Sequence, residues 1–146
     1  MPLEGEYIPS TFTYARDQAD LIESSGGTQG LELGGRPVIV LTSVGAKSGA
    51  LRKNVLMRVE HEGQYAVVGS RGGKPQNPDW VYNLRKHPQV ELQDGPEKHD
   101  YTAQELAGAE RDLWWDRAVT AYPDYAEYPT RTTRVIPVFL LTRTEP

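Results

Sequence analysis

The chain has 146 residues, of which 38% are hydrophobic and 25% charged, and its formal net charge is −4. This length fits one domain (residues 1–146) with a single core, and no apolar run reaches the roughly 20 residues of a membrane-spanning helix. Cysteine is absent, which excludes disulfides, thiolate nucleophiles and cysteine metal sites and is compatible with a reducing cytoplasm.

The charge is distributed unevenly along the chain. Residues 41–74 hold six Lys or Arg against two Glu, a local charge of +4, so the remaining residues carry −8. A basic segment inside an acidic protein indicates a local anionic ligand rather than a long nucleic-acid track.

The first half of the chain predicts one helix and three strands. Residues 1–10 are polar and bounded by proline, and we expect them to be flexible. A helix is predicted from Thr11 or Thr13 to a stop at Ser24–Gly27. Three strands follow, at Val38–Ser43, Leu51–Glu60 and Gln64–Gly69. Their connections are too short for crossover helices, which favours an antiparallel meander.

The second half predicts two more helices and three more strands. Asn77 as the N-cap and Pro78 at the first helical position begin a helix that Pro88 ends. Another helix is predicted at Ala109–Tyr122, and its expected inner face consists of Leu113, Trp114, Ala118 and Ala121. The strands are expected at Gln89–Gln93, Lys98–Glu105 and Val135–Leu141. About six mostly antiparallel strands with three flanking helices predict an α+β domain built around a small barrel.

Two loops rich in glycine and cations leave predicted core strands. The first, Gly45-Ala46-Lys47-Ser48-Gly49, precedes Arg52 and Lys53, and the second, residues 70–76, contains Arg71 and Lys74. Glycine takes positive φ freely, so such loops expose backbone N–H groups that suit a phosphate or another polyanion. By itself the first loop is more simply a hairpin turn with solvated lysines. Adjacent strand ends would bring both loops to one rim of the barrel, next to a helix N-terminus with further N–H donors.

Familiar catalytic templates are absent from the sequence. Ala46 separates Gly45 from Lys47, which breaks the Walker A spacing, and no G-x-G-x-x-G follows the first strand. No metal site is expected, because carboxylates at ligand spacing are missing around His61, His87 and His99. The serines show no triad signature, so acid–base catalysis is not the natural interpretation.

The other charged and aromatic side chains are assigned to the surface, to a helix or to a ring-binding position. We take Arg58, Arg85 and Lys86 as solvated surface charges. Trp114 and Trp115 are interpreted as core and rim of a helix. Trp80 and Met57 are candidates to cover a flat ring beside the two loops.

Five motifs between about Gly30 and the last strand form a specific combination: LTSVGAKSGALRKNVLM (Leu41–Met57), VVGSRGG (Val67–Gly73), NPDWVYNL (Asn77–Leu84), HPQVELQDG (His87–Gly95) and AYPDYAEY (Ala121–Tyr128). Together they resemble the deazaflavin-dependent nitroreductase and quinone reductase family of actinobacteria. The resemblance implies a split β-barrel of the FMN-binding type. It also implies coenzyme F-420, a deazaflavin whose tail of phosphate and glutamates agrees with the basic segment.

Carried over by position, the resemblance implies three sets of site residues. Contacts with the phosphate and tail fall on Lys47, Ser48, Arg52 and Lys53. The deazaflavin ring is expected between Asn54, Val55, Met57, Val68, Ser70, Arg71, Trp80 and Asn83. The substrate-facing and catalytic set is Met57, Ser70, Tyr122, Tyr125 and Tyr128. The three tyrosines have a simpler alternative role, which is to pack the C-terminal segment.

The activity implied by the resemblance is hydride transfer from reduced coenzyme F-420 to a quinone, enone or nitroaromatic acceptor. Relatives that reduce nitroimidazoles carry tyrosine at the position of Met57, so that activity stays open. Two alternatives remain: a protein that binds or stores deazaflavin without turnover, and a split barrel that uses FMN or haem. We expect a cytoplasmic protein that binds no nucleic acid, and split barrels commonly form homodimers. Membrane contact would be peripheral only, because the first helix carries Arg16, Asp17, Asp20 and Glu23.

Overall fold

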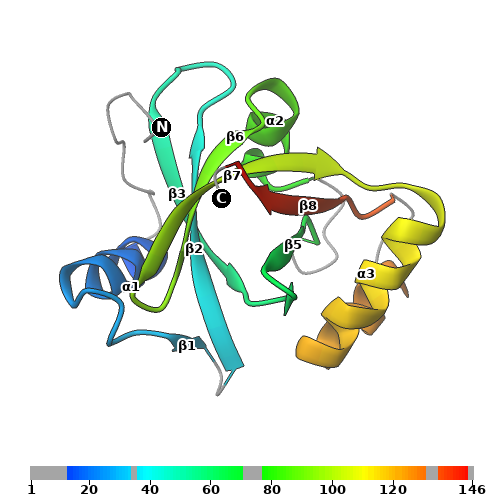
Figure 1. Cartoon of the computed structure of the whole chain (residues 1–146), viewed down its shortest axis with the longest axis horizontal. Coiled ribbons are helices and arrows are strands. Elements are labelled where there is room, and N and C mark those ends of the chain that lie inside the picture. The colour runs from blue at the N-terminus through cyan, green and yellow to red at the C-terminus, as the bar shows by residue number, and fades with distance from the viewer. Residues whose placement is uncertain (1–12, 34–35, 71–76, 131–134, 145–146) are drawn as a thin grey trace.

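A computed structural model describes residues 13–33, 36–70, 77–130 and 135–144 (Figure 1). The helices are α1 (Thr13–Ser24), α2 (Asp79–Lys86), α3 (Gly108–Ala121) and the 3₁₀-helix η2 (Pro123–Thr130). The strands are β1 (Glu32–Leu33), β2 (Arg36–Val44), β3 (Leu51–Met57), β4 (Glu60–His61), β5 (Gln64–Val68), β6 (Gln89–Asp94), β7 (Glu97–Glu105) and β8 (Val138–Arg143). The predicted flexible start, residues 1–10, and residues 71–76 of the second glycine loop lie outside the described ranges.

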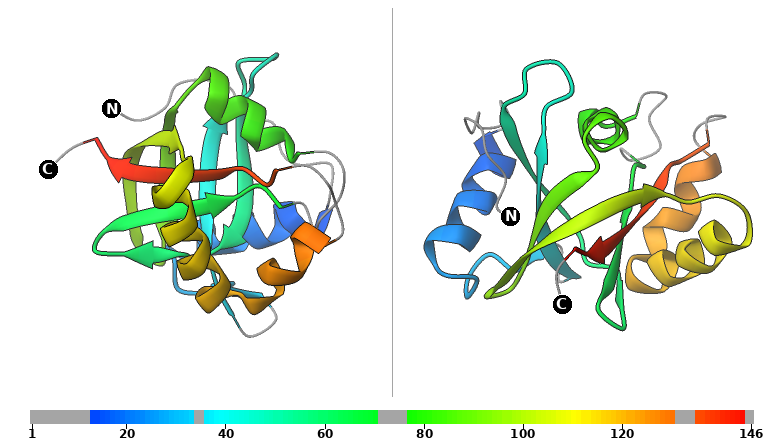
Figure 2. Two further views of the ribbon diagram at one scale, coloured as in Figure 1. Left: turned by 90° about the vertical axis from the view of Figure 1, so that its right-hand side faces the viewer. Right: turned by 45° about the horizontal axis from the view of Figure 1, so that its top comes forward.

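The described strands form one antiparallel sheet that curls into a split barrel. The strand order is β1-β2-β6-β7-β8-β5-β4, and β3 pairs with the other edge of β2. Because β1 and β4 have two residues each, six longer strands make up most of the sheet. Helix α1 lies on one side of the barrel, and α3 with η2 lies on the other (Figure 1, Figure 2). The predicted α+β fold with about six antiparallel strands and three helices is confirmed.

The predicted meander is wrong at its third strand. β2 and β3 form the expected hairpin, but β5 pairs with β8 and β4 instead of β3. The chain changes partner at a corner, where the Arg58 N–H donates to the Pro37 carbonyl oxygen at 3.0 Å. One residue later, the Val59 carbonyl oxygen accepts from the Ala66 N–H at 2.9 Å. The predicted strand Leu51–Glu60 is therefore two strands, β3 and β4, that belong to different halves of the split barrel.

Strand β2 is buried on both of its faces. Alternate side chains of a strand point to opposite sides of the sheet. Val38 and Val40 pack against Ile22 of α1, while Ile39 and Leu41 point into the barrel. A strand covered on both sides needs a continuous apolar run, which is the pattern seen in the sequence.

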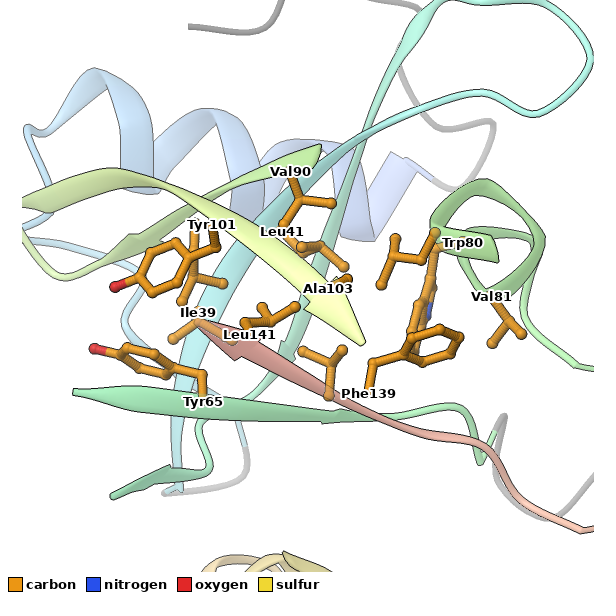
Figure 3. Packing of buried hydrophobic residues seen from close by; sticks show 13 residues of the cluster. Ile39, Leu41, Tyr65, Trp80, Val81, Val90, Tyr101, Ala103, Phe139 and Leu141 are labelled. Atoms are coloured by element: carbon orange, nitrogen blue, oxygen red, sulfur yellow. The ribbon is translucent and has the colours of Figure 1, made fainter. Parts of the chain in front are cut away.

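The barrel interior is a single apolar core (Figure 3). Trp80 of α2 lies at one end, with its ring 6.0 Å from that of Phe139. Tyr65 and Tyr101 lie at the other end, with ring centroids 5.7 Å apart. Between them the core is filled by Ile39, Leu41, Val67, Val81, Leu84, Val90, Leu92, Ala103 and Leu141. Helix α2 therefore closes one end of the barrel.

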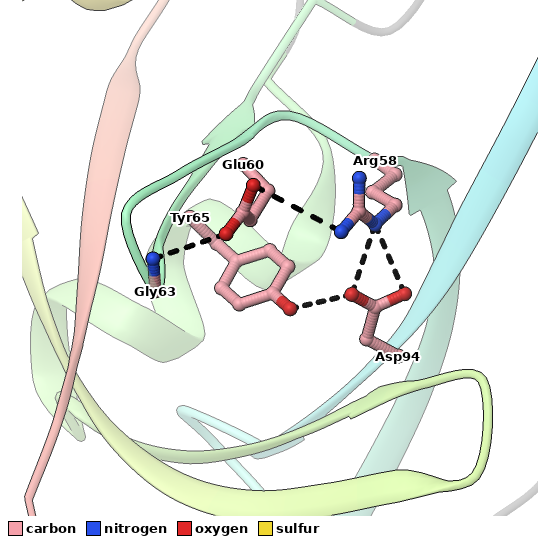
Figure 4. Close-up of polar contacts among 5 residues, drawn as sticks. All are labelled: Arg58, Glu60, Gly63, Tyr65 and Asp94. Carbon is pink, nitrogen blue, oxygen red and sulfur yellow. Dashed lines mark hydrogen bonds and ion pairs between the residues drawn. The ribbon is translucent and has the colours of Figure 1, made fainter.

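A polar cluster closes the opposite end (Figure 4). Arg58 Nε donates to both carboxylate oxygens of Asp94, at 3.1 and 2.9 Å, and Tyr65 Oη donates to Asp94 Oδ2 at 2.5 Å. Glu60 lies 3.9 Å from the Arg58 guanidinium and accepts from the Gly63 N–H at 3.0 Å. Burial of Tyr65, together with its bond to Asp94, raises the pKa of its hydroxyl. The interpretation of Arg58 as a solvated surface charge is wrong, because Arg58 ties the corner to the end of β6.

Two details of the predicted helices are also wrong. Pro78, not Asn77, is the N-cap of α2, and among the described residues no side chain caps this helix. In α3, Leu113 is 49% exposed, whereas Trp114 and Ala118 are buried. Each residue step turns a helical side chain by about 100°, so Leu113 cannot share the face of two residues spaced four apart.

Candidate functional site

The predicted anion-binding loop is a tight connection between β2 and β3. The Gly45 N–H donates to the Ala50 carbonyl oxygen at 2.7 Å, and the Gly49 N–H donates to the Gly45 carbonyl oxygen at 3.0 Å. Gly49 has a φ of +72°, which glycine adopts without steric cost. Ser48 Oγ accepts from the Ala50 N–H at 3.1 Å, so its own hydroxyl proton can still be donated to a ligand. The loop is thus ordered from within, while Lys47 and Ser48 are exposed.

Helix α2 packs against this loop through polar contacts. Asn83 Oδ1 accepts from the Ala46 N–H at 2.9 Å, and Asn83 Nδ2 donates to Ser43 Oγ at 3.2 Å. One turn further, Lys86 Nζ donates to the Ala46 carbonyl oxygen at 2.7 Å. Helix and loop therefore form one connected unit.

A cleft of about 360 Å³ opens between the loop and α2. Its lining residues are Gly45, Ala46, Lys47, Ser48, Arg52, Asp79, Tyr82 and Asn83. Three of the four predicted tail contacts, Lys47, Ser48 and Arg52, are brought together here with the predicted ring contact Asn83. Two cations and a hydroxyl group in one cleft suit a phosphate or a carboxylate, because charged donors make the strongest hydrogen bonds to such anions.

The sequence did not single out Asp79 and Tyr82, which also line the cleft. They stand three residues apart on α2, so they share a face of the helix. Tyr82 is 47% exposed, and the guanidinium carbon of Arg85 lies 5.8 Å from its ring centroid. Helical spacing places Asp79 and Tyr82 on one face of α2, but no local signal in the sequence marks that face as the one beside the loop.

Strand alternation divides the predicted residues of β3 between two faces. On the outer face, Lys53 Nζ pairs with Glu23 Oε1 of α1 at 2.5 Å, and Val55 and Met57 pack against the α1-facing apolar cluster. The fourth predicted tail contact, Lys53, therefore bonds to α1 and does not line the cleft. The other face carries Arg52, Asn54 and Leu56, the first at the cleft and the last against the barrel core.

The three predicted acceptor tyrosines form a separate cluster at the end of α3 and within η2. The ring centroids of Tyr122 and Tyr125 are 4.9 Å apart, and those of Tyr125 and Tyr128 are 5.9 Å apart. The hydroxyl oxygens of Tyr122 and Tyr128 lie 3.3 Å from each other. Burial, followed by the two neighbouring tyrosines, raises the pKa of Tyr125, which is 6% exposed. Met57 and Val68 belong to the same apolar cluster, so the structure unites these five predicted residues.

The remaining predicted ring contacts lie elsewhere. Trp80 is 3% exposed and packs inside the barrel, on the opposite side of β5 from the tyrosines. Ser70 is buried directly after β5, where the preceding Gly69 packs so closely that an added Cβ would lie 2.8 Å from Val81 Cγ2. The end of β5 and the first glycine loop thus both meet α2. Arg71 lies outside the described residues.

In the described part of the chain, no cluster of three or more His, Asp or Glu has the geometry of metal ligands. The histidines instead meet other partners: His61 lies edge-on to Trp114, with ring centroids 6.4 Å apart, and His99 Nε2 lies 3.2 Å from Glu97. None of the described helices is both long and apolar enough to span a bilayer.

The fold is that of the FMN-binding type of split barrel. The haem storage protein HutZ of Vibrio cholerae has the same fold, with a TM-score of 0.56 over 75% of this chain and 82% of that one. Their sequences are only 13% identical, so this likeness concerns the fold alone.

The chain belongs to the F420H(2)-dependent quinone reductase family, whose family model matches residues 14–143. A quinone reductase of this description from Mycobacterium tuberculosis is 34% identical over 113 residues, which are 75% of this chain and 76% of that protein. A solved F420-H2 dependent reductase is 52% identical, with a TM-score of 0.69 over 73% of this chain and 95% of that one. Another solved structure, described as a domain-swapped dimer, is 47% identical, with a TM-score of 0.72 over 91% and 100%. The family resemblance seen in the sequence is confirmed.

Proposed function

We propose that this protein transfers a hydride from reduced coenzyme F-420 to a quinone. The main support is the cleft, which brings Lys47, Ser48 and Arg52 together in a chain that belongs to this family. An anionic tail of phosphate and glutamates matches that donor set. The bound coenzyme would supply the hydride, while the protein supplies binding, orientation and electrostatics.

Each residue of the cleft has a distinct part in holding the tail. Arg52 offers a planar fork that can bond two oxygens of one phosphate or carboxylate, and Lys47 offers a compact charge. Ser48 adds a neutral hydrogen bond, since its oxygen is already occupied by the Ala50 N–H. Asp79 on the facing helix is acidic and would repel the tail, so it favours binding on the side of the loop.

The quinone is proposed to bind at the tyrosine cluster. Tyr122 and Tyr128 hold their hydroxyl groups 3.3 Å apart, and such a pair can donate to a quinone carbonyl oxygen. Reduction of a quinone by a hydride also requires a proton, which a tyrosine hydroxyl or a water molecule would deliver to the oxygen and then recover from solvent. Tyr125, with its raised pKa, stays protonated and supports the pair from within the apolar cluster. Met57 packs against both this cluster and the α1-facing cluster, and so joins the tyrosines to β3.

The proposal also covers further acceptors, the oligomeric state and the location of the protein. Enones and nitroaromatics would be further acceptors at the same cluster. A homodimer is supported by the 47% identical relative that is described as a domain-swapped dimer. A cytoplasmic location, with peripheral contact to reach membrane-borne quinones, agrees with the lack of cysteine.

The proposal is tested in two steps with the purified protein. Titration with coenzyme F-420 is followed by quenching of deazaflavin fluorescence, and binding at micromolar protein is expected. Reduced coenzyme is then mixed with the protein, with and without a soluble naphthoquinone, and its oxidation is followed by absorbance. Oxidation should require both protein and quinone. Binding without oxidation would indicate a storage protein instead, and absence of binding would refute the proposal.

A further inference from the structure

We infer that Asn83 and Lys86 are positioning residues, which together hold Ala46 and thereby fix the loop that binds the coenzyme tail. The inference rests on the proposed function for the identity of the ligand. Both would act through the backbone of the loop: Lys86 does not line the cleft, and Asn83, which does, uses both ends of its amide on Ala46 and Ser43.

Asn83 links the loop to the end of β2. Its side chain is 6% exposed, and both ends of the amide are used, by the Ala46 N–H and by Ser43 Oγ. The orientation of the amide is determined by chemistry, because a backbone N–H can only donate and must therefore face Oδ1. Ser43 is itself fully buried. Asn83 thus connects strand β2 to a loop that has glycine at both ends.

Lys86 completes the attachment from the same face of α2. It stands three residues after Asn83, the spacing at which helical side chains are neighbours. Its ammonium group bonds the Ala46 carbonyl oxygen at 2.7 Å, a short distance for a charged donor. Both polar backbone groups of Ala46 are therefore held by α2. A loop bounded by Gly45 and Gly49 has many accessible conformations when it is not held, so this attachment reduces the entropy lost on ligand binding.

The alternative role for Lys86 is direct contact with the anionic tail. The geometry opposes it, because Lys86 is not among the lining residues of the cleft, whereas Lys47 and Arg52 are. Its ammonium group is instead directed to the Ala46 carbonyl oxygen, on the helix side of the loop. Lys86 was interpreted from sequence as a solvated surface charge, and this bond gives it a specific partner.

The test compares two ligands on three variants. The ligands are coenzyme F-420 and the deazaflavin chromophore that lacks the phosphate and glutamate tail. Lys86→Met removes the donor and keeps most of the stem, and Lys86→Arg keeps a charged donor. Arg143→Met, at the exposed end of β8, removes one positive charge away from the cleft and serves as the control.

Lys86→Met should weaken binding of coenzyme F-420 about five- to tenfold, the effect of one lost charged hydrogen bond at an exposed site. Binding of the tail-less chromophore should stay within twofold of wild type, as should binding of coenzyme F-420 to Lys86→Arg and Arg143→Met. The ratio of the dissociation constants of wild type and Lys86→Met for coenzyme F-420 should stay the same at ~1 M salt, where the Debye length is roughly 3 Å. A loss that disappears in salt would make Lys86 a direct electrostatic contact and overturn the inference. Unchanged binding, or equal loss for both ligands, would overturn it as well.

A second readout needs no ligand. Asn83→Ala should increase the exchange rate of the Ala46 amide hydrogen at least tenfold, while amides of the β6–β7 hairpin keep their rates. Unchanged exchange at Ala46 in a folded variant would refute the Asn83 part, and if that variant does not fold, Lys86→Met decides. Failure of the wild type to bind coenzyme F-420 would refute the proposed function, while the exchange measurement would still decide whether α2 holds the loop.

Discussion

Replacing Tyr65 by phenylalanine should destabilise the protein by about 1.5–2 kcal/mol. The variant keeps the aromatic ring in the barrel core and loses only the hydroxyl group, which donates to Asp94 Oδ2 at 2.5 Å. Hydrogen bonds to charged groups contribute roughly 1.5–3 kcal/mol. The lower half of that range applies here, because the Asp94 side chain is 22% exposed and still accepts from Arg58.

The assay is urea unfolding followed by circular dichroism, with the free energy taken from the midpoint and slope. Tyr101→Phe is the matched control, since Tyr101 lies beside Tyr65 at the same end of the barrel and, among the described residues, its hydroxyl group makes no hydrogen bond to Asp94 or Arg58. We expect the control to change stability by less than about 0.5 kcal/mol. Equal effects of the two substitutions would refute the reasoning.

The difference in unfolding free energy between wild type and Tyr65→Phe should also depend on pH. Burial and the bond to Asp94 raise the pKa of Tyr65 in the folded state, so the folded protein holds this proton more tightly than the unfolded chain does. The stabilisation is fully present below the unfolded value of about 10 and is lost as the pH rises through the folded value. The difference in unfolding free energy between wild type and Tyr65→Phe should therefore narrow above about pH 10. A constant difference would contradict the assigned cause.

Three further substitutions, the last with a matched control, test the site and the α1 turn. Arg52→Ala should weaken binding of coenzyme F-420 about tenfold and that of the tail-less chromophore less than twofold; equal losses would contradict the placement of the tail. Tyr128→Phe should lower quinone turnover several-fold at unchanged coenzyme affinity, and unchanged turnover would place the acceptor elsewhere. Gly27→Ala should lower the free energy of unfolding by more than ~2 kcal/mol, because φ is +80° and the new Cβ would lie 1.8 Å from the Gly95 carbonyl oxygen. Gly26→Ala is the control, because Gly26 has a φ of +67° and open space around it, and it should lower the free energy of unfolding by only about 1 kcal/mol. Similar melting temperatures for the two variants would refute the steric explanation.

Local signals in the sequence predicted the parts of the fold that depend on near neighbours. The helix stop at Ser24–Gly27 is confirmed in detail: the Gly26 N–H donates to the Glu23 carbonyl oxygen at 3.1 Å and the Gly27 N–H to that of Ile22 at 2.8 Å. This is the pattern of a glycine-terminated helix. The loop after β2 was equally readable, because its glycines and cations lie within one short stretch.

Long-range pairing could not be read from the sequence. The contact between Arg58 and Asp94 joins residues 36 positions apart, and nothing local marks them as partners. The switch of strand partner at Val59 likewise depends on the position of β5 across the barrel. Lys53 stands beside Arg52 in sequence, yet strand alternation sends it to Glu23 of α1 instead of the cleft. Such side-chain and strand partners can be predicted only when it is known which way each strand face points and where the helices pack.

We propose that the cleft between the glycine loop and α2 holds the anionic tail while the protein reduces a quinone. This proposal is tested most directly by the rate at which the wild-type protein oxidises reduced coenzyme F-420 in the presence of a naphthoquinone, compared with the reduced tail-less chromophore at the same subsaturating concentration. We expect quinone-dependent oxidation of both, with that of the full coenzyme at least tenfold faster. Equal rates would contradict the assignment of the cleft, and absence of quinone-dependent oxidation would contradict the proposed activity.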